Sequence, residues 1–318
     1  MRYNIDPELR PILDMLPPLD LKDYQTARAA MDGMAAQINP TIDTSGVIIS
    51  DRNIPGASTD IQVPVRIYQP ENASGSVPGL MHFHGGGFVF GNLESEYAMC
   101  VNLCRTLGIV VVSVDYRMPP EHAYPAAVDD CYAALCWTHA QRETLGIDGN
   151  RLGVMGQSAG GCLSAVCAIK ARDLGGPRIC YQFLGIPVTD DRLQTKSMQD
   201  FVDAPIWYTE NAQRSWDFYL GEQYQRGADN VPELAAPARA KNLEGLPPAC
   251  VTVMEFDPLR DEGLAYAQRL LDAGVSTEIH CYPGTFHGSS MVTTAAVSQR
   301  EAADMLDALR RGLCVSPA

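Results

Sequence analysis

Residues 152–161, LGVMGQSAGG, decide the fold. An apolar strand pattern runs into the motif G-x-S-x-G, formed by Gly156, Ser158 and Gly160, and a helical pattern follows at once. A serine on such a strand-to-helix turn is presented above a sheet, because the flanking glycines let the backbone pack tightly around it. The spacing is not that of a dinucleotide-binding loop, and no G-K-[ST] follows. Ser158 is therefore the candidate nucleophile.

Apolar segments alternate with amphipathic segments from about residue 46 onward. This rhythm predicts an α/β fold with a mostly parallel, eight-stranded sheet and helices on both faces. The expected strands cover residues 47–50, 63–68, 80–83, 110–114, 152–155, 180–184, 249–254 and 277–282. The expected helices cover residues 94–107, 126–140, 159–172, 262–273 and 298–312. No helix separates the first two strands, so they are expected to pair antiparallel.

Two regions interrupt this rhythm. Residues 1–45 have a helical pattern before any strand, and residues 190–228 form a long insertion rich in aromatic residues. Insertions of this size inside a compact domain are usually functional, for example as a lid. We expect the two regions to form a helical cap, over a core made of residues 46–189 and 229–318.

A serine needs a general base, and the base an orienting acid. In a fold of this type the partners follow the serine in the order acid, histidine, which leaves His280 and His287. His280 falls inside a strand pattern, whereas His287 lies in a loop beyond Pro283-Gly284. The favoured pair is therefore His287 with Asp257, which follows a strong strand. The same segment also offers Glu255, Asp261 and Glu262, and the alternative acids after the preceding strand are Asp190 and Asp191.

The run HFHGGGFVFG at residues 82–91 needs an explanation, because glycine loses more conformational entropy on folding than any other residue. A metal site would need a third ligand nearby, and a phosphate loop would lead into a helix with a lysine. A serine nucleophile instead needs backbone donors for a developing oxyanion. We expect these to be the amides of Gly85, Gly86 and Ala159, with His84 bracing the loop and no role for His82.

Substrate-pocket residues are predicted from their neighbourhood in the sequence. Phe88 follows the glycines, Gln157 precedes the nucleophile, and Trp207 and Tyr208 belong to the aromatic insertion. Together they are expected to line an apolar pocket for the acyl or alcohol part of a substrate.

The charge and composition exclude several classes of protein. The net charge of -14 repels phosphate backbones, so nucleic acid is not an expected partner. No apolar run reaches the roughly 20 residues of a membrane helix, and residues 1–16 do not read as a signal peptide. We expect a cytoplasmic protein without membrane insertion. The 10 cysteines include no C-x-x-C pair and are read as small buried side chains, so neither metal nor cofactor is expected.

Four blocks together resemble the bacterial hormone-sensitive-lipase-like (family IV) carboxylesterases of the α/β-hydrolase fold. They are HGGG at 84–87, YRMPPEHAYPA at 116–126, GQSAG at 156–160, and DPLRD at 257–261 followed by His287-Gly288. The resemblance implies carboxylic ester hydrolysis with Ser158, Asp257 and His287 as triad, through an acyl-enzyme. A cap close to the site favours short-to-medium acyl chains over long triglycerides. It also implies a helical cap and a homodimer formed near residues 277–282.

Other functions on the same fold remain as alternatives. An amidase or carbamate hydrolase would use the same triad, and a ligand-binding homologue would lack a catalytic group. Gln157 stands where the family often has Asp, Thr or Glu, which leaves the subgroup open. Arg117 and Glu121 are expected to form a structural pair.

Overall fold

The computed structural model describes residues 3–13, 15, 21–58 and 60–315. Its centre is an eight-stranded sheet in the order β1-β2-β4-β3-β5-β6-β7-β8. The strands are β1 (Val47–Pro55), β2 (Gln62–Pro70), β3 (Val77–Phe83), β4 (Val110–Val114), β5 (Ile147–Gln157), β6 (Tyr181–Gly185), β7 (Ala249–Phe256) and β8 (Thr277–Phe286). Strand β2 pairs antiparallel with β1 and β4, and the other pairs are parallel. The predicted fold class and the antiparallel first pair are confirmed.

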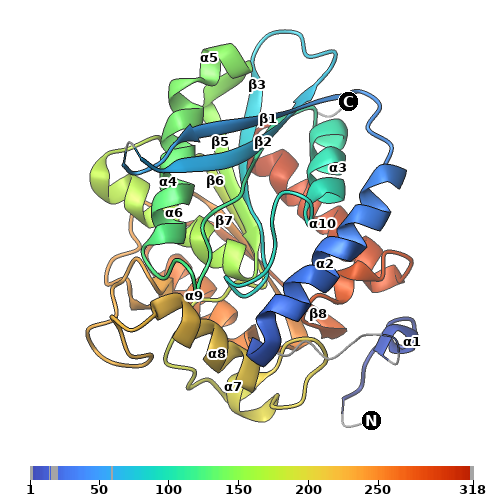
Figure 1. Ribbon diagram of the computed structural model, residues 1–318, viewed down its shortest axis with the longest axis vertical. Coiled ribbons are helices and arrows are strands. Elements are labelled where there is room, and N and C mark those ends of the chain that lie inside the picture. Colours follow the sequence, from blue (N-terminus) through green and yellow to red (C-terminus); the bar gives the residue numbers. More distant parts are fainter. Residues whose placement is uncertain (1–2, 14, 16–20, 59, 316–318) are drawn as a thin grey trace.

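Helices cover both faces of the sheet (Figure 1). One apolar core joins α3 (Tyr97–Leu107) and α10 (Ala296–Gly312) to one face. A larger core packs α4 (Ala126–Ala140), α6 (Ala159–Leu174) and α9 (Arg260–Asp272) against the other. The central strands are buried on both sides, which is why they read as continuous apolar runs. The short α5 (Arg142–Leu145) precedes β5.

The N-terminal region and the insertion meet at one end of the sheet, in the lower part of Figure 1. The N-terminal region contains α1 (Arg10–Leu13), η1 (Leu21–Asp23), α2 (Tyr24–Ile38) and η2 (Asn39–Thr41), and the insertion contains α7 (Lys196–Asp200) and α8 (Thr209–Leu220). The Tyr24 and Phe218 rings meet edge to face at 5.7 Å, and Lys22 pairs with Glu210 at 3.1 Å. These contacts join the two regions, and the cap boundaries at residues 45, 190 and 228 stay a prediction.

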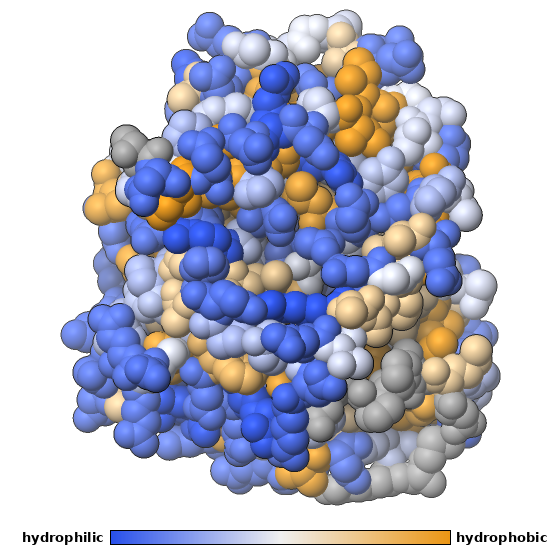
Figure 2. Space-filling model, viewed as in Figure 1, coloured by the Kyte–Doolittle hydropathy of each residue, from blue (hydrophilic) through white to orange (hydrophobic). Residues whose placement is uncertain are grey.

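The surface in Figure 2 is mostly hydrophilic, with apolar residues in small groups between polar ones. Within the described ranges, no helix is long and apolar enough to cross a bilayer. Strand β8 lies at one end of the strand order. The homodimer expected at this edge stays a prediction.

Candidate active site

Ser158 occupies a strained turn between β5 and α6. Its backbone has φ 57° and ψ -117°, a conformation that costs energy for a residue with a side chain and recurs at functional sites. The turn is tight because glycine lies on both sides: a Cβ on Gly160 would sit 1.9 Å from the carbonyl oxygen of Phe83. The Ser158 amide donates to the Gly185 carbonyl at 2.8 Å. Backbone packing alone therefore fixes the position of the serine.

Asp257 and His287 meet beyond the carboxyl ends of β7 and β8. His287 Nδ1 lies 2.7 Å from Asp257 Oδ2, and both side chains are buried. The Leu259 amide donates to Asp257 Oδ1 at 2.9 Å, which fixes the carboxylate. An imidazole held at Nδ1 by a carboxylate presents Nε2 as a base. Ser158 Oγ is buried and has no hydrogen-bond partner among the described residues.

The alternative candidates have other partners. Asp190 pairs with Arg192 at 2.7 Å. Asp191 is buried, and Arg239 Nη2 donates to its Oδ2 at 2.8 Å. His280 Nε2 lies 2.7 Å from Glu278 Oε1. The geometry thus favours Asp257 and His287 over each of them.

His84 braces the glycine loop that follows β3. Its ring stacks on Tyr116 with centroids 4.0 Å apart, and its Nδ1 lies 2.8 Å from the Gly85 carbonyl oxygen. The Tyr116 hydroxyl donates to the His84 carbonyl at 2.8 Å. A Cβ on Gly91 would lie 2.4 Å from His84 Nδ1, so this glycine makes room for the ring.

The part of Gly85 as an oxyanion donor stays a prediction. Its backbone lies beside the carboxyl group of Glu96 and lowers the pKa of Glu96, which burial raises to about 7. Gly86 and Gly87 have φ values of 102° and 57°, and their amides have no protein acceptor in the described part of the chain. Sequence reasoning missed Glu96 because only the folded chain brings the start of α3 to the loop.

The expected pocket residues differ in position. Phe88 is fully buried and stacks on Tyr219 with centroids 4.0 Å apart, and its part in the pocket stays a prediction. Trp207 does lie at the site: its ring centroid is 5.7 Å from that of His287, and it contacts Gly87. Gln157 and Tyr208 are half-buried, and their part in substrate binding stays a prediction.

Three further carboxylates have structural partners. Arg117 pairs with Asp130 at 2.8 Å and Glu121 with Arg28 at 2.9 Å, so the expected Arg117–Glu121 pair is wrong. Glu262, one of the carboxylates that follow the strand before Asp257, accepts from the Thr189 amide through Oε1 at 2.7 Å. This buried side chain of α9 ties the loop after β6 to the helix that follows Asp257.

Comparison with known proteins places this geometry in a family. A protein-family model described as alpha/beta hydrolase fold matches residues 80–291 of the sequence. A solved structure named bacterial heroin esterase is 50% identical, with a TM-score of 0.96 and 98% of each chain covered. Esterase LipI of Mycobacterium tuberculosis is 37% identical over 89% of this chain and 87% of its own. Carboxylesterase NlhH of the same species is 35% identical over 98% and 97%. The chain belongs to the α/β-hydrolase family, among its hormone-sensitive-lipase-like carboxylesterases.

Proposed function

We propose that this protein hydrolyses short-to-medium-chain carboxylic esters through an acyl-enzyme on Ser158. The observation that carries the proposal is the buried Asp257–His287 hydrogen bond. It lies beyond the carboxyl ends of the parallel strands, as does the strained serine turn. An oriented imidazole and a presented hydroxyl are the two elements that nucleophilic acyl transfer requires.

The chemistry follows in two steps. His287 Nε2 takes the proton of Ser158 as Oγ attacks the ester carbonyl, and gives it to the leaving alcohol. Water, deprotonated by His287, then attacks the acyl-enzyme, and His287 returns the proton to Ser158 Oγ as the bond to the acyl group breaks and the acid leaves. Asp257 keeps the imidazole in the required tautomer and stabilises its charged form without taking the proton.

We assign the oxyanion donors to the amides of Gly86, Gly87 and Ala159. The Gly85 backbone lies beside the Glu96 carboxyl group, whereas the Ala159 amide opens the first turn of α6, where amides lack intrahelical partners. The dipole of a helix N-terminus also favours negative charge there. In other serine hydrolases, losing one such donor costs about 3–4 kcal/mol of transition-state stabilisation.

Trp207 supports the preference for small substrates. The indole is buried, contacts Gly87 and lies over the His287 ring, so it narrows the space beside the base. Long acyl chains would have to displace this ring.

An acyl-length series tests the proposal. We expect p-nitrophenyl acetate and butyrate to be turned over with much higher kcat/KM than the octanoate and palmitate. A fluorophosphonate probe should label the wild type and not Ser158→Ala, while Ser74→Ala, an exposed control, should be labelled normally.

Three outcomes would contradict it. An unlabelled wild type would indicate a ligand-binding homologue, and faster turnover of matched anilides would indicate an amidase. A preference for palmitate would refute the role given to Trp207.

A further inference from the structure

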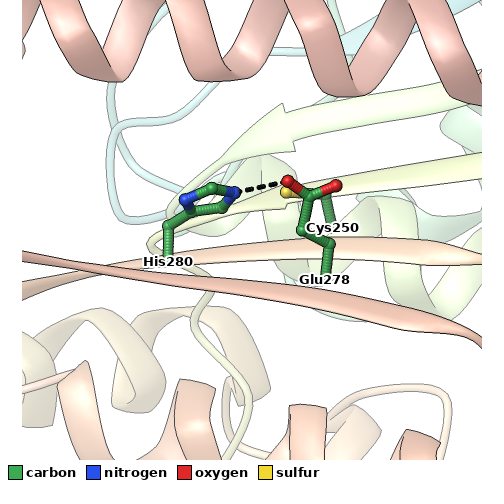
Figure 3. Close-up of side chains that lie close together, drawn as sticks. All are labelled: Cys250, Glu278 and His280. Atoms are coloured by element: carbon green, nitrogen blue, oxygen red, sulfur yellow. Dashed lines mark hydrogen bonds and ion pairs between the residues drawn. The ribbon is translucent and has the colours of Figure 1, made fainter.

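Cys250, Glu278 and His280 gather on one face of the sheet, outside the catalytic site. Cys250 lies opposite Glu278 in the pairing of β7 with β8, and His280 is two residues along on the same side. Their ligand atoms all lie within 4.8 Å of one another (Figure 3). Cys250 lies near the start of β7, whereas Asp257 follows its far end. At about 3.3 Å per residue, the cluster is about 20 Å from the catalytic acid.

The three side chains provide the donors that zinc prefers. A thiolate sulfur binds Zn²⁺ at about 2.3 Å, and imidazole nitrogen or carboxylate oxygen at about 2.0–2.2 Å. Figure 3 shows the imidazole and the carboxylate facing each other, with the sulfur beside the carboxylate. His280 Nε2 and Glu278 Oε1 are already 2.7 Å apart, so small rotations would open space for an ion.

Neighbouring groups orient these donors. Arg311 donates to Glu278 Oε2 at 2.6 Å, which leaves Oε1 toward His280. On the other side of the ring, Asp304 of α10 lies 3.7 Å from His280 Nδ1 and accepts from the Tyr282 hydroxyl at 3.0 Å. The nitrogen that faces Glu278 Oε1 at 2.7 Å is Nε2, so a metal would bind there and displace the proton of this hydrogen bond.

Solvent can reach the cluster. The Glu278 and His280 side chains are 37% and 26% exposed, while Cys250 is buried. Glu278 and Arg311 also line a cavity of about 500 Å³.

We propose that Cys250, Glu278 and His280 form a binding site for one Zn²⁺-class divalent ion, with water as the fourth ligand. The thiolate and imidazole select such an ion over Mg²⁺ or Ca²⁺, which prefer oxygen ligands alone. Ion binding replaces the proton between His280 and Glu278 and joins β7 to β8. These strands lead to Asp257 and His287, so the site is a structural clamp and contributes no atom to the reaction.

Cobalt provides the direct test. Chelator-treated protein titrated with Co²⁺ should show thiolate-to-metal charge-transfer absorption and tetrahedral d–d bands that saturate at one ion per chain. Zn²⁺ should displace the colour and raise the unfolding temperature. Cys250→Ser should abolish the charge-transfer band, and His280→Ala, at a partly exposed position, should weaken binding at least tenfold.

Cys281→Ser is the matched control, because this exposed cysteine is the next residue on β8 and points to the opposite face. It should bind Co²⁺ as the wild type does. Three results would overturn the proposal: no saturable spectrum, a spectrum that survives in Cys250→Ser and His280→Ala, or equal loss in Cys281→Ser.

Discussion

The nucleophile turn and the acid–base pair are built in different ways. Ser158 is placed by backbone contacts, with Gly160 pressed against the Phe83 carbonyl. Asp257 and His287, 30 residues apart, are joined by one side-chain hydrogen bond between two loops. A turn made by glycine sterics leaves little freedom, whereas a side-chain pair can be lost with the fold intact. The first region should therefore fail by misfolding and the second by losing activity.

The largest effect is expected for Gly160→Ala. The new Cβ would lie 1.9 Å from the Phe83 oxygen and 2.7 Å from the His84 oxygen, and both are backbone atoms that cannot yield cheaply. We expect a loss of more than about 4 kcal/mol of unfolding free energy, or no folded protein. Denaturant unfolding followed by circular dichroism measures it.

Gly33→Ala is the control for this prediction. Gly33 lies within α2, and a Cβ there would meet nothing within 4 Å. Alanine should stabilise this helix by about 0.5–1 kcal/mol. If Gly160→Ala were as stable as Gly33→Ala, the steric account of the nucleophile turn would be wrong.

Asp257→Asn should break the second region without unfolding the chain. The amide oxygen can still accept from Leu259, but the imidazole loses its charged partner. We expect kcat to fall by roughly 10³–10⁴, with little change in the unfolding midpoint. Steady-state kinetics on p-nitrophenyl acetate measures the loss.

Asp191→Asn should behave in the opposite way. It breaks a buried pair with Arg239, which should cost about 3–5 kcal/mol of stability while kcat of the folded protein stays within a few-fold. Near-normal activity in Asp257→Asn, together with inactive Asp191→Asn, would move the catalytic acid to Asp191.

The same contrast explains what the sequence could predict. Ser158 is recognisable from G-x-S-x-G because the glycines that its tight turn requires lie two positions away on either side. The choice between Asp257 and Asp191 stayed open, because Arg239, which engages Asp191, lies 48 residues away. Strand β4 was predicted with its observed bounds, while β5 begins at Ile147, earlier than expected, since its pairing with Val77 overrides the polar residues 148–151.

Gly85 shows the limit most clearly. The glycine run draws attention to backbone amides, but only the fold brings the Glu96 carboxyl group beside the Gly85 backbone. The charge of the Glu96 carboxyl group also changes near neutral pH, because burial raises its pKa to about 7. The carboxyl group faces His82 on β3 at 3.9 Å, and lies near the Cys100 thiol on α3 and the Tyr116 hydroxyl.

Glu96→Gln should have a moderate, pH-dependent effect. Burial raises the folded-state pKa of Glu96 from 4.5 to about 7, so the folded protein binds its proton more tightly than the unfolded chain does. Stability should fall as pH rises from about 5 to 7.5, by about 1–3 kcal/mol from this group. Glutamine, which cannot ionise, should flatten that loss.

Unfolding free energies at pH 5 and pH 8 measure the effect. The difference between wild type and Glu96→Gln should appear at pH 8 and shrink at pH 5. Glu143→Gln, at a side chain that is 90% exposed, should show no such difference. An equal shift at both pH values would mean that the burial of charge at Glu96 is not the cause.

The smallest effect is expected for Ser215→Ala, where the insertion contacts the glycine loop. The buried Ser215 hydroxyl of α8 donates to the Gly87 carbonyl at 2.7 Å. A neutral hydrogen bond of this kind contributes about 1 kcal/mol. Gly87 is one of the assigned oxyanion donors. Losing this hydrogen bond to its carbonyl should therefore lower kcat by roughly 2–10-fold with little change in KM.

Ser164→Ala is the matched control for Ser215→Ala. Its hydroxyl is equally buried and donates to the Gly160 carbonyl at 2.8 Å within α6, four residues away. The helix keeps its own backbone hydrogen bonds without it, so we expect kcat to be unchanged. If both variants lowered kcat equally, the effect would come from general loosening of the core. A fall confined to Ser215→Ala would show that the insertion positions Gly87, and that this loop, unlike the nucleophile turn, depends on a side-chain contact from outside the core.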